Sequence, residues 1–184
     1  MKLSIPHRRQ LTDYMCGPAT LQMVLAFLGE QKTQRSIRKL MMVSPKELQT
    51  KSADNNKMVR AIQRAGFYAY VNDHSNIDEL KSFINQGYPV VINYIEPSND
   101  DGHFAVVKGY NPLLKTIILN DPWNGDDFTF SEKEFIGRWH PKWWRASEGY
   151  KGHWLMVASR APINVGRLHA PYKYTKPDKK SPTK

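Results

Sequence analysis

Apolar residues in the first half of the chain recur at helical spacing. Those between Leu21 and Leu28 lie three or four positions apart, and Gly29 stands where a helix C-cap belongs, which predicts a helix over about 17–28. Capping residues and terminal glycines predict further helices over 33–42, from 44 onward, over 54–65 and over 76–86.

The second half of the chain has a different pattern. Segments rich in Val, Ile and aromatic residues predict strands over 67–72, 88–95, 103–110, 116–121 and 153–159, with a short one over 128–130. Ser131 and Glu134 form a capping box that opens a short helix toward Trp139. Helices first and strands afterwards indicate an α+β fold, a helical lobe packed on an antiparallel sheet. The cleft between two such lobes is a natural place for a site.

Charge divides the chain into a body and a tail. The chain has 184 residues and a net charge of +10, of which 160–184 carries +6 and 1–159 only +4. The length suits one domain, so we expect a domain over 1–160 and a flexible, basic, Pro- and Lys-rich tail over 161–184. Contact of this tail with nucleic acid or an anionic membrane is the less favoured interpretation, since such tails commonly only solubilise.

The cysteine count and the apolar runs limit the protein class. One cysteine excludes an intramolecular disulfide framework and suits a reducing compartment. We see neither a secretory signal nor a transmembrane segment, which predicts a cytoplasmic location, although leaderless export stays open. With one cysteine, scattered histidines and no phosphate-binding glycine loop, we expect no metal and no cofactor. The sequence does not indicate an oligomeric state.

The single cysteine, Cys16, stands at the start of the first predicted helix. Unpaired N–H groups and aligned dipoles at a helix N-terminus favour negative charge and lower a thiol pKa. Gly17 leaves room for a substrate beside the sulfur, and Pro18 is tolerated in a first turn. The alternative is a buried, inert cysteine, which is the common case for a lone one.

His103 begins a predicted strand, and Asp121 ends the next one. If the hairpin between them is centred on Pro112, each lies nine residues from the centre, and the two form a directly opposed cross-strand pair. A carboxylate there can hold one ring nitrogen and leave the other for a thiol. A slip of one residue places Asn120 opposite His103 instead. His153, which also opens a strand, is the second candidate base.

Four short motifs together resemble the bacteriocin-processing cysteine peptidases. They are Gln10 six positions before Cys16, the run Cys16-Gly17-Pro18-Ala19-Thr20-Leu21, the run Gly102-His103-Phe104-Ala105-Val106-Val107, and Asn120-Asp121-Pro122-Trp123. The resemblance spans roughly residues 8–160 and implies a papain-like fold. Since we see no transporter segments, it points to a stand-alone member. Members bound to transporters cleave leader peptides after a double glycine.

The resemblance also implies a role for each residue. Cys16 would be the nucleophile, His103 the base, Asp121 the residue that orients it, and Gln10 an oxyanion-hole donor together with the backbone N–H of Cys16. The expected function is a cysteine peptidase that acts on a peptide or protein.

Two alternatives stay open. The same site could perform acyl or γ-glutamyl transfer. The chain could also be a non-enzymatic module that binds an acidic partner or nucleic acid through the tail and the Trp- and Arg-rich stretch 138–145, including Trp139 and Trp144.

Overall fold

The computed structural model describes residues 1–51, 53–140, 153–163 and 172–175. Within these ranges the helices are α1 (Cys16–Phe27), α2 (Gln34–Leu40), α3 (Pro45–Lys51), α4 (Asn55–Arg64), α5 (Ile77–Asn85) and α6 (Glu132–Arg138). The strands are β1 (Tyr68–Asn72), β2 (Val90–Ile95), β3 (Gly102–Asn111), β4 (Thr116–Asp121), β5 (Gly125–Ser131), β6 (Leu155–Ser159) and β7 (Tyr172–Thr175).

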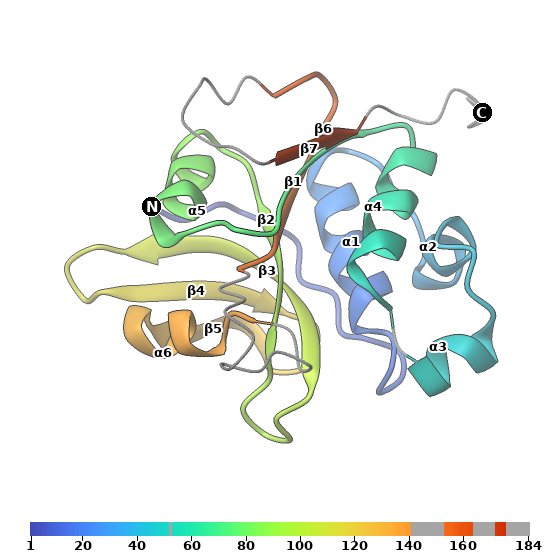
Figure 1. Ribbon diagram of the computed structural model, residues 1–184, viewed down its shortest axis with the longest axis horizontal. Helices are drawn as coiled ribbons and strands as arrows, with labels where there is room; N and C mark the ends of the chain where they lie inside the picture. Colours follow the sequence, from blue (N-terminus) through green and yellow to red (C-terminus); the bar gives the residue numbers. More distant parts are fainter. Residues whose placement is uncertain (52, 141–152, 164–171, 176–184) are drawn as a thin grey trace.

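The strands form one antiparallel sheet in the order β5-β4-β3-β2-β6-β1-β7. In Figure 1, α1 to α4 gather on one side of the molecule, while α5 and α6 lie with the β3–β5 part of the sheet on the other side. This arrangement confirms the predicted α+β class, a helical lobe on an antiparallel sheet.

Side chains cap the helices where the sequence predicts. Thr33 accepts from the backbone N–H of Ser36, Asp54 from Lys57 and Ser131 from Glu134. Each cap satisfies a first-turn amide that has no partner within its helix. α1 differs, because its N-cap residue, Met15, makes no side-chain cap. The first-turn amides of α1 are therefore left to other partners.

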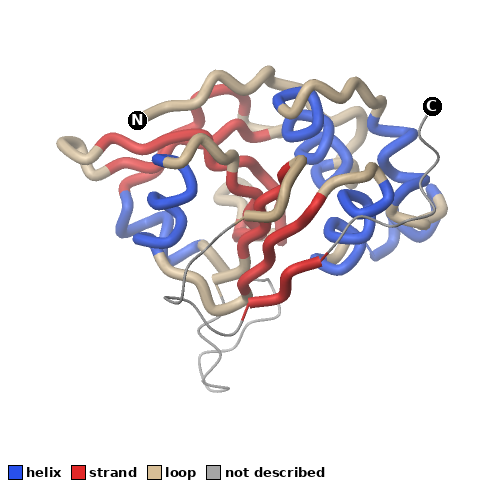
Figure 2. Tube along the Cα trace, turned by 90° about the horizontal axis from the view of Figure 1, so that it is seen from above, coloured by secondary structure: helices blue, strands red, loops and turns tan. Residues whose placement is uncertain are grey.

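Both faces of the sheet are covered, which explains why the strands are apolar at successive positions. Val91, Phe104 and Val106 face the core under α1, α2 and α4. Ile92, Ala105 and Val107, their neighbours in sequence, face a second core with residues of α5 and α6. Figure 2 shows helices on either side of the strands. Successive side chains in the middle of β2 and β3 thus face the two cores in alternation.

Two regions differ from the sequence prediction. β7, which falls within the predicted tail, pairs with β1 as the edge strand, so those four residues belong to the sheet. The rest of the tail from 164 lies outside the described residues, and the boundary at 160 stays a prediction. β5 spans seven residues, where the pattern indicates only 128–130, since the alternation of exposed and buried positions in β5 is irregular. Among the described residues, no helix has the length and apolarity that crossing a bilayer requires.

Candidate active site

Cys16 is the first residue of α1, and α1 packs against β3. Its side chain is buried and hydrogen-bonded to His103, and the backbone amides of Gly17 and Phe104 also point to the sulfur. Thr20, one turn further on, donates its hydroxyl to the carbonyl of Phe104 at 2.9 Å and fixes α1 to the strand. The thiol therefore lies where the helical lobe meets the sheet.

His103 and Asp121 meet, but not as the direct pair that the sequence predicts. His103 Nε2 lies 3.2 Å from Asp121 Oδ1. In the β-ladder, however, His103 faces Tyr94 of β2, and the β3–β4 ladder pairs Val106 with Asn120. The next position of that ladder sets Asp121 beside Ala105, two residues from His103 on the same face. The predicted register is wrong by two residues, and the contact is diagonal.

A β-bulge in β3 explains why the two side chains still share a face. Val107 pairs with Leu119 and Gly109 with Ile118, so Lys108 is the extra residue. Without the bulge, the register at the hairpin would continue and turn Asp121 to the opposite face from His103.

The Lys108 side chain is buried and forms ion pairs with Asp126 and with Asp127, the latter at 2.8 Å. These carboxylates lie on β5 and anchor the lysine across β4.

Asp121 is fully buried, and its carboxylate has several donors. Oδ1 accepts from the backbone N–H groups of Trp123 at 2.8 Å and Asn124 at 2.7 Å, as in an Asx turn. Oδ2 accepts from the hydroxyl of Tyr94 at 2.8 Å. The amide of Asn124 also bridges Oδ1 and Glu96 Oε1, at 3.4 and 3.1 Å. Tyr94 and Asn124 lack any motif signal and were missed by sequence reasoning.

Contacts with neighbouring groups shift the three pKa values in directions that suit a charged pair. Burial raises the pKa of the Cys16 thiol, but the hydrogen bond and positive charge of His103 outweigh it, and the pKa is lowered overall. Burial alone would lower the pKa of His103, yet hydrogen bonds to Asp121 and Cys16 raise it to about 10. Burial opposes ionisation of Asp121, but its bonds to His103, Asn124 and Tyr94 hold its pKa below the ordinary value. These shifts favour a thiolate beside an imidazolium.

Gln10 is buried in the loop before α1. Its Nε2 donates to the carbonyl of Thr12 at 2.9 Å, and its backbone N–H donates to Pro122 at 3.0 Å, next to Asp121. An amide nitrogen carries two hydrogens, so among the described residues one N–H of this group is left for another acceptor. Within the described part of the chain, Gln10 Oε1 has no hydrogen-bond partner.

A second glutamine, which sequence reasoning missed, holds the loop of Gln10. Gln34 of α2 is buried and donates to the carbonyl of Arg9 at 2.8 Å. Its Oε1 accepts from the N–H of Leu11 at 3.0 Å. The two backbone groups that flank Gln10 are thus held by one side chain from another helix.

The alternative candidates Asn120 and His153 bind other groups, as does His7. Asn120 donates to the carbonyl of Ile5 at 3.1 Å and so tethers the N-terminal segment. His153 stacks on Trp139 with ring centroids 4.8 Å apart, and its Nδ1 lies 3.2 Å from the carbonyl of Ser75. Burial lowers the pKa of His153. His7 lies 2.9 Å from the backbone oxygen of Asp121 and does not contact its carboxylate.

Two further interpretations of the sequence need correction. Gly17 does not serve substrate access, because a Cβ there would lie 3.0 Å from Ala53 and Met58, and the glycine allows α1 to pack closely. Trp139 is fully buried and donates to the carbonyl of Trp154 at 2.8 Å, so it is not available to stack on a ligand. The rest of the Trp- and Arg-rich stretch, 141–145, lies outside the described residues.

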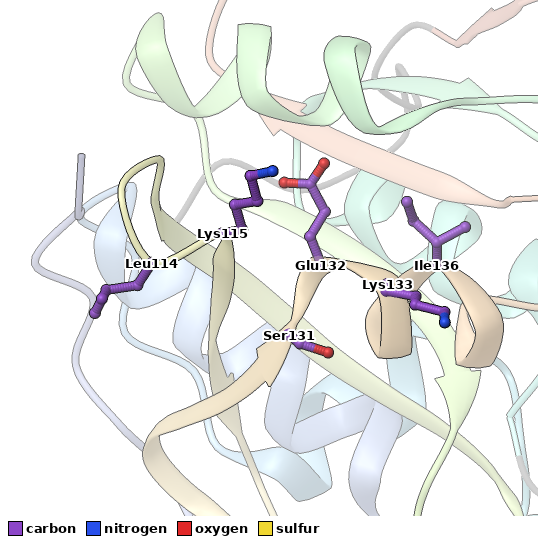
Figure 3. A pocket seen from close by; sticks show the side chains of 6 residues that line it. All are labelled: Leu114, Lys115, Ser131, Glu132, Lys133 and Ile136. Atoms are coloured by element: carbon purple, nitrogen blue, oxygen red, sulfur yellow. The ribbon is translucent and has the colours of Figure 1, made fainter.

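A surface pocket of about 510 Å³ lies elsewhere, between the β3–β4 turn and the start of α6. Figure 3 shows it among Leu114, Lys115, Ser131, Glu132, Lys133 and Ile136. None of these residues belongs to the Cys16 site. In the described ranges, no group of three His, Cys, Asp or Glu side chains is arranged to hold a metal ion.

The helical lobe packed on an antiparallel sheet is the fold of papain-like peptidase domains. The model of the Peptidase_C39 like family matches residues 2–143. The chain belongs to this family, and both the resemblance noted from the motifs and the predicted papain-like fold are confirmed. Family and fold together support a cysteine peptidase. A comparison with curated proteins found no match.

Solved structures with the same fold include peptidase domains of transporters. The peptidase domain of Streptococcus ComA, a bi-functional ABC transporter involved in quorum sensing, has a TM-score of 0.66 at 18% identity, over 86% of this chain and 100% of that domain. A putative C39-like peptidase from Bacillus anthracis also gives 0.66, at 15% identity over 88% of this chain and 100% of that one.

A third structure contains a bound peptide. It is a double glycine motif protease from an AMS/PCAT transporter in complex with its leader peptide, with a TM-score of 0.57 at 21% identity, over 85% of this chain and 92% of that one. At these identities the three structures show a shared fold and no more.

Proposed function

We propose that this chain is a cysteine peptidase in which Cys16 is the nucleophile, His103 the general acid and base, and Asp121 the residue that orients His103. Gln10 and the backbone N–H of Cys16 form the oxyanion hole. The substrate is a peptide or protein, in keeping with the leader peptide bound by the related transporter protease. We further propose that residues 1–160 form the peptidase domain, which contains the whole family match.

The first half of the reaction forms a thioester. The Cys16 thiolate attacks the carbonyl carbon of the scissile bond, and the oxygen takes up the negative charge. The free N–H of Gln10 and the N–H of Cys16, at the uncapped start of α1, stabilise that charge. His103 then gives its proton to the leaving nitrogen, the C–N bond breaks, and the amine product departs.

The second half releases the acid product. Neutral His103 removes a proton from a water molecule, and the hydroxide attacks the thioester carbonyl. The C–S bond breaks, the carboxylic acid leaves, and the thiolate forms again beside the protonated imidazole. Asp121 holds the Nε2 side of the ring throughout, which leaves Nδ1 to face Cys16.

The observation that carries the proposal is the unbroken series of contacts from Cys16 through His103 to Asp121 at the boundary of the two lobes. A buried, inert cysteine has no need of an imidazole hydrogen-bonded to a buried carboxylate. The lowered pKa of Cys16 and the raised pKa of His103 agree with an activated thiol.

The test is the rate of Cys16 alkylation by iodoacetamide against pH, in wild type and in His103→Ala. We expect wild type to react well below pH ~8.5, the pH at which an ordinary thiol is half ionised. His103→Ala should lose this acid reactivity, whereas His153→Ala, the matched control, should keep it. An ordinary thiol profile in wild type would refute the proposal.

Gln10→Ala separates activation of the thiol from stabilisation of the oxyanion. Alkylation forms no oxyanion, so its pH profile should match wild type, while turnover of a peptide substrate should fall by about 10²–10³-fold. Product analysis with an added amine distinguishes hydrolysis from acyl transfer. A free acid as the only product supports the peptidase, and an amide adduct as the main product would contradict it.

A further inference from the structure

Tyr94 touches both His103 and Asp121. It lies directly opposite His103 in the β2–β3 ladder, and its ring meets the imidazole edge-on, with centroids 5.7 Å apart and an interplanar angle of 80°. The parity of β2 turns Tyr94 to the face that also carries Asp121. A second edge-on contact, with Phe130 at 5.9 Å, fixes the ring from β5. The tyrosine is fully buried.

The hydroxyl of Tyr94 binds the carboxylate oxygen that His103 does not use. His103 and the two backbone amides of the Asx turn all bind Oδ1 of Asp121, whereas Tyr94 donates to Oδ2 at 2.8 Å. A carboxylate held at one oxygen can rotate about its Cβ–Cγ bond, and a donor on the second oxygen prevents this. Burial and the charge of Asp121 raise the pKa of Tyr94 far above its usual value, so this hydroxyl keeps its proton.

We propose that Tyr94 is a positioning residue, which holds the Asp121 carboxylate and the His103 ring in the geometry that keeps the Cys16 thiolate charged. The inference rests on the proposed function of the site. Tyr94 acts only through Asp121 and His103 and does not itself meet a substrate. Loss of the hydroxyl leaves one buried carboxylate oxygen without this donor, so Asp121 is protonated more easily and the imidazolium loses its counter-ion.

Several titratable groups border this centre and have to be considered in a pH experiment. Cys16 approaches from α1 and His103 from β3. Glu96, just after β2, reaches Asp121 only through the amide of Asn124. His7 bonds the backbone oxygen of Asp121 from the N-terminal segment. All of these groups are retained when the Tyr94 hydroxyl is removed. A change in the acid limb of the pH profile of Cys16 alkylation therefore measures the effect of that hydroxyl.

The test compares Tyr94→Phe with Tyr70→Phe by the pH profile of Cys16 alkylation. Tyr70 is the matched control, because it is equally buried and also donates its hydroxyl to a buried carboxylate, that of Glu79. We expect the acid limb of Tyr94→Phe to move to higher pH, so that the alkylation rate on that limb falls by about three- to tenfold. Tyr70→Phe should coincide with wild type.

A second replacement preserves the shape of the side chain. 3-Fluorotyrosine at position 94 is a stronger donor, and it should move the acid limb to lower pH, opposite to Tyr94→Phe. Superposable profiles for wild type, Tyr94→Phe and the fluorinated protein would overturn the role of Tyr94 while wild type stays acid-reactive. An ordinary thiol profile in wild type would instead refute the proposed function, so the two failures can be told apart.

Discussion

Two buried carboxylates, Asp121 and Glu79, differ in a way that distinguishes a reactive centre from a structural one. Glu79 accepts from the hydroxyl of Tyr70, from Asn72 at 2.8 Å and from Ser75 at 2.5 Å, all neutral donors. Asp121 also accepts from a tyrosine, but its Oδ1 meets His103, which in turn meets a thiol. Both carboxylates are nearly or fully buried, so burial alone does not separate them.

The difference lies in what each carboxylate can do with its charge. Neutral donors satisfy the Glu79 carboxylate and tie the start of α5 to β1, which stabilises the fold. At Asp121 the negative charge also stabilises a cation, and that cation stabilises a thiolate. A buried polar centre becomes a candidate for catalysis when a titratable partner transmits its charge to a nucleophile.

The largest expected effect is on the titration of His103. The pKa of its imidazole is raised from 6.5 to about 10, so the ring should stay protonated through neutral pH and release its proton only near pH 10. NMR titration of the His103 ring carbons measures this directly. A midpoint near 6.5 would show that Asp121 and Cys16 do not stabilise the cation.

The next effect separates the two carboxylates through the thiol. Asp121→Asn removes the negative charge beside the imidazolium, so the thiolate loses stabilisation and alkylation of Cys16 at acid pH should slow by about tenfold or more. Glu79→Gln, the matched variant, should leave the alkylation profile in place. Equal effects of the two substitutions would mean that Asp121 acts only on the fold.

The smallest expected effect is on stability. Three donors bind the two carboxylate oxygens of Glu79. Glu79→Gln replaces one of these oxygens with an NH₂ group, which cannot accept a hydrogen bond, so a buried hydrogen bond is lost. We expect the free energy of unfolding to fall by about 1–3 kcal/mol, measured by urea denaturation at neutral pH. Unchanged stability would indicate that the Glu79 cluster relaxes without cost and is not the structural centre we describe.

Much of the fold follows from local patterns in the sequence. Helix caps such as Thr33 and Asp54 appear where the sequence predicts them, because a cap involves residues only two or three positions apart. The Val- and Ile-rich segments form strands, since both faces of the sheet are covered. The position of Cys16 at the start of α1 is local in the same sense.

The meeting of His103 with Asp121 depends on the tertiary structure. Simple counting from Pro112 pairs them directly, whereas the structure reaches the contact through the bulge at Lys108 and a diagonal neighbour. The bulge residue, Lys108, forms ion pairs with carboxylates of β5. No local sequence pattern in β3 and β4 predicts these partners, because they lie on a third strand.

The sequence by itself thus determined the types and the order of α1 to α6 and of β1 to β6, and it indicated the candidate site residues, whereas β7 lay within the predicted tail. Only the tertiary structure decided the register of β3 against β4. It alone also brought Tyr94 of β2 to Asp121, and Gln34 of α2 to the loop of Gln10. The physical reason is the separation along the chain of the residues that interact. Capping and periodicity act over a few residues, while these contacts join residues 23 to 27 positions apart and depend on how the strands and helices pack.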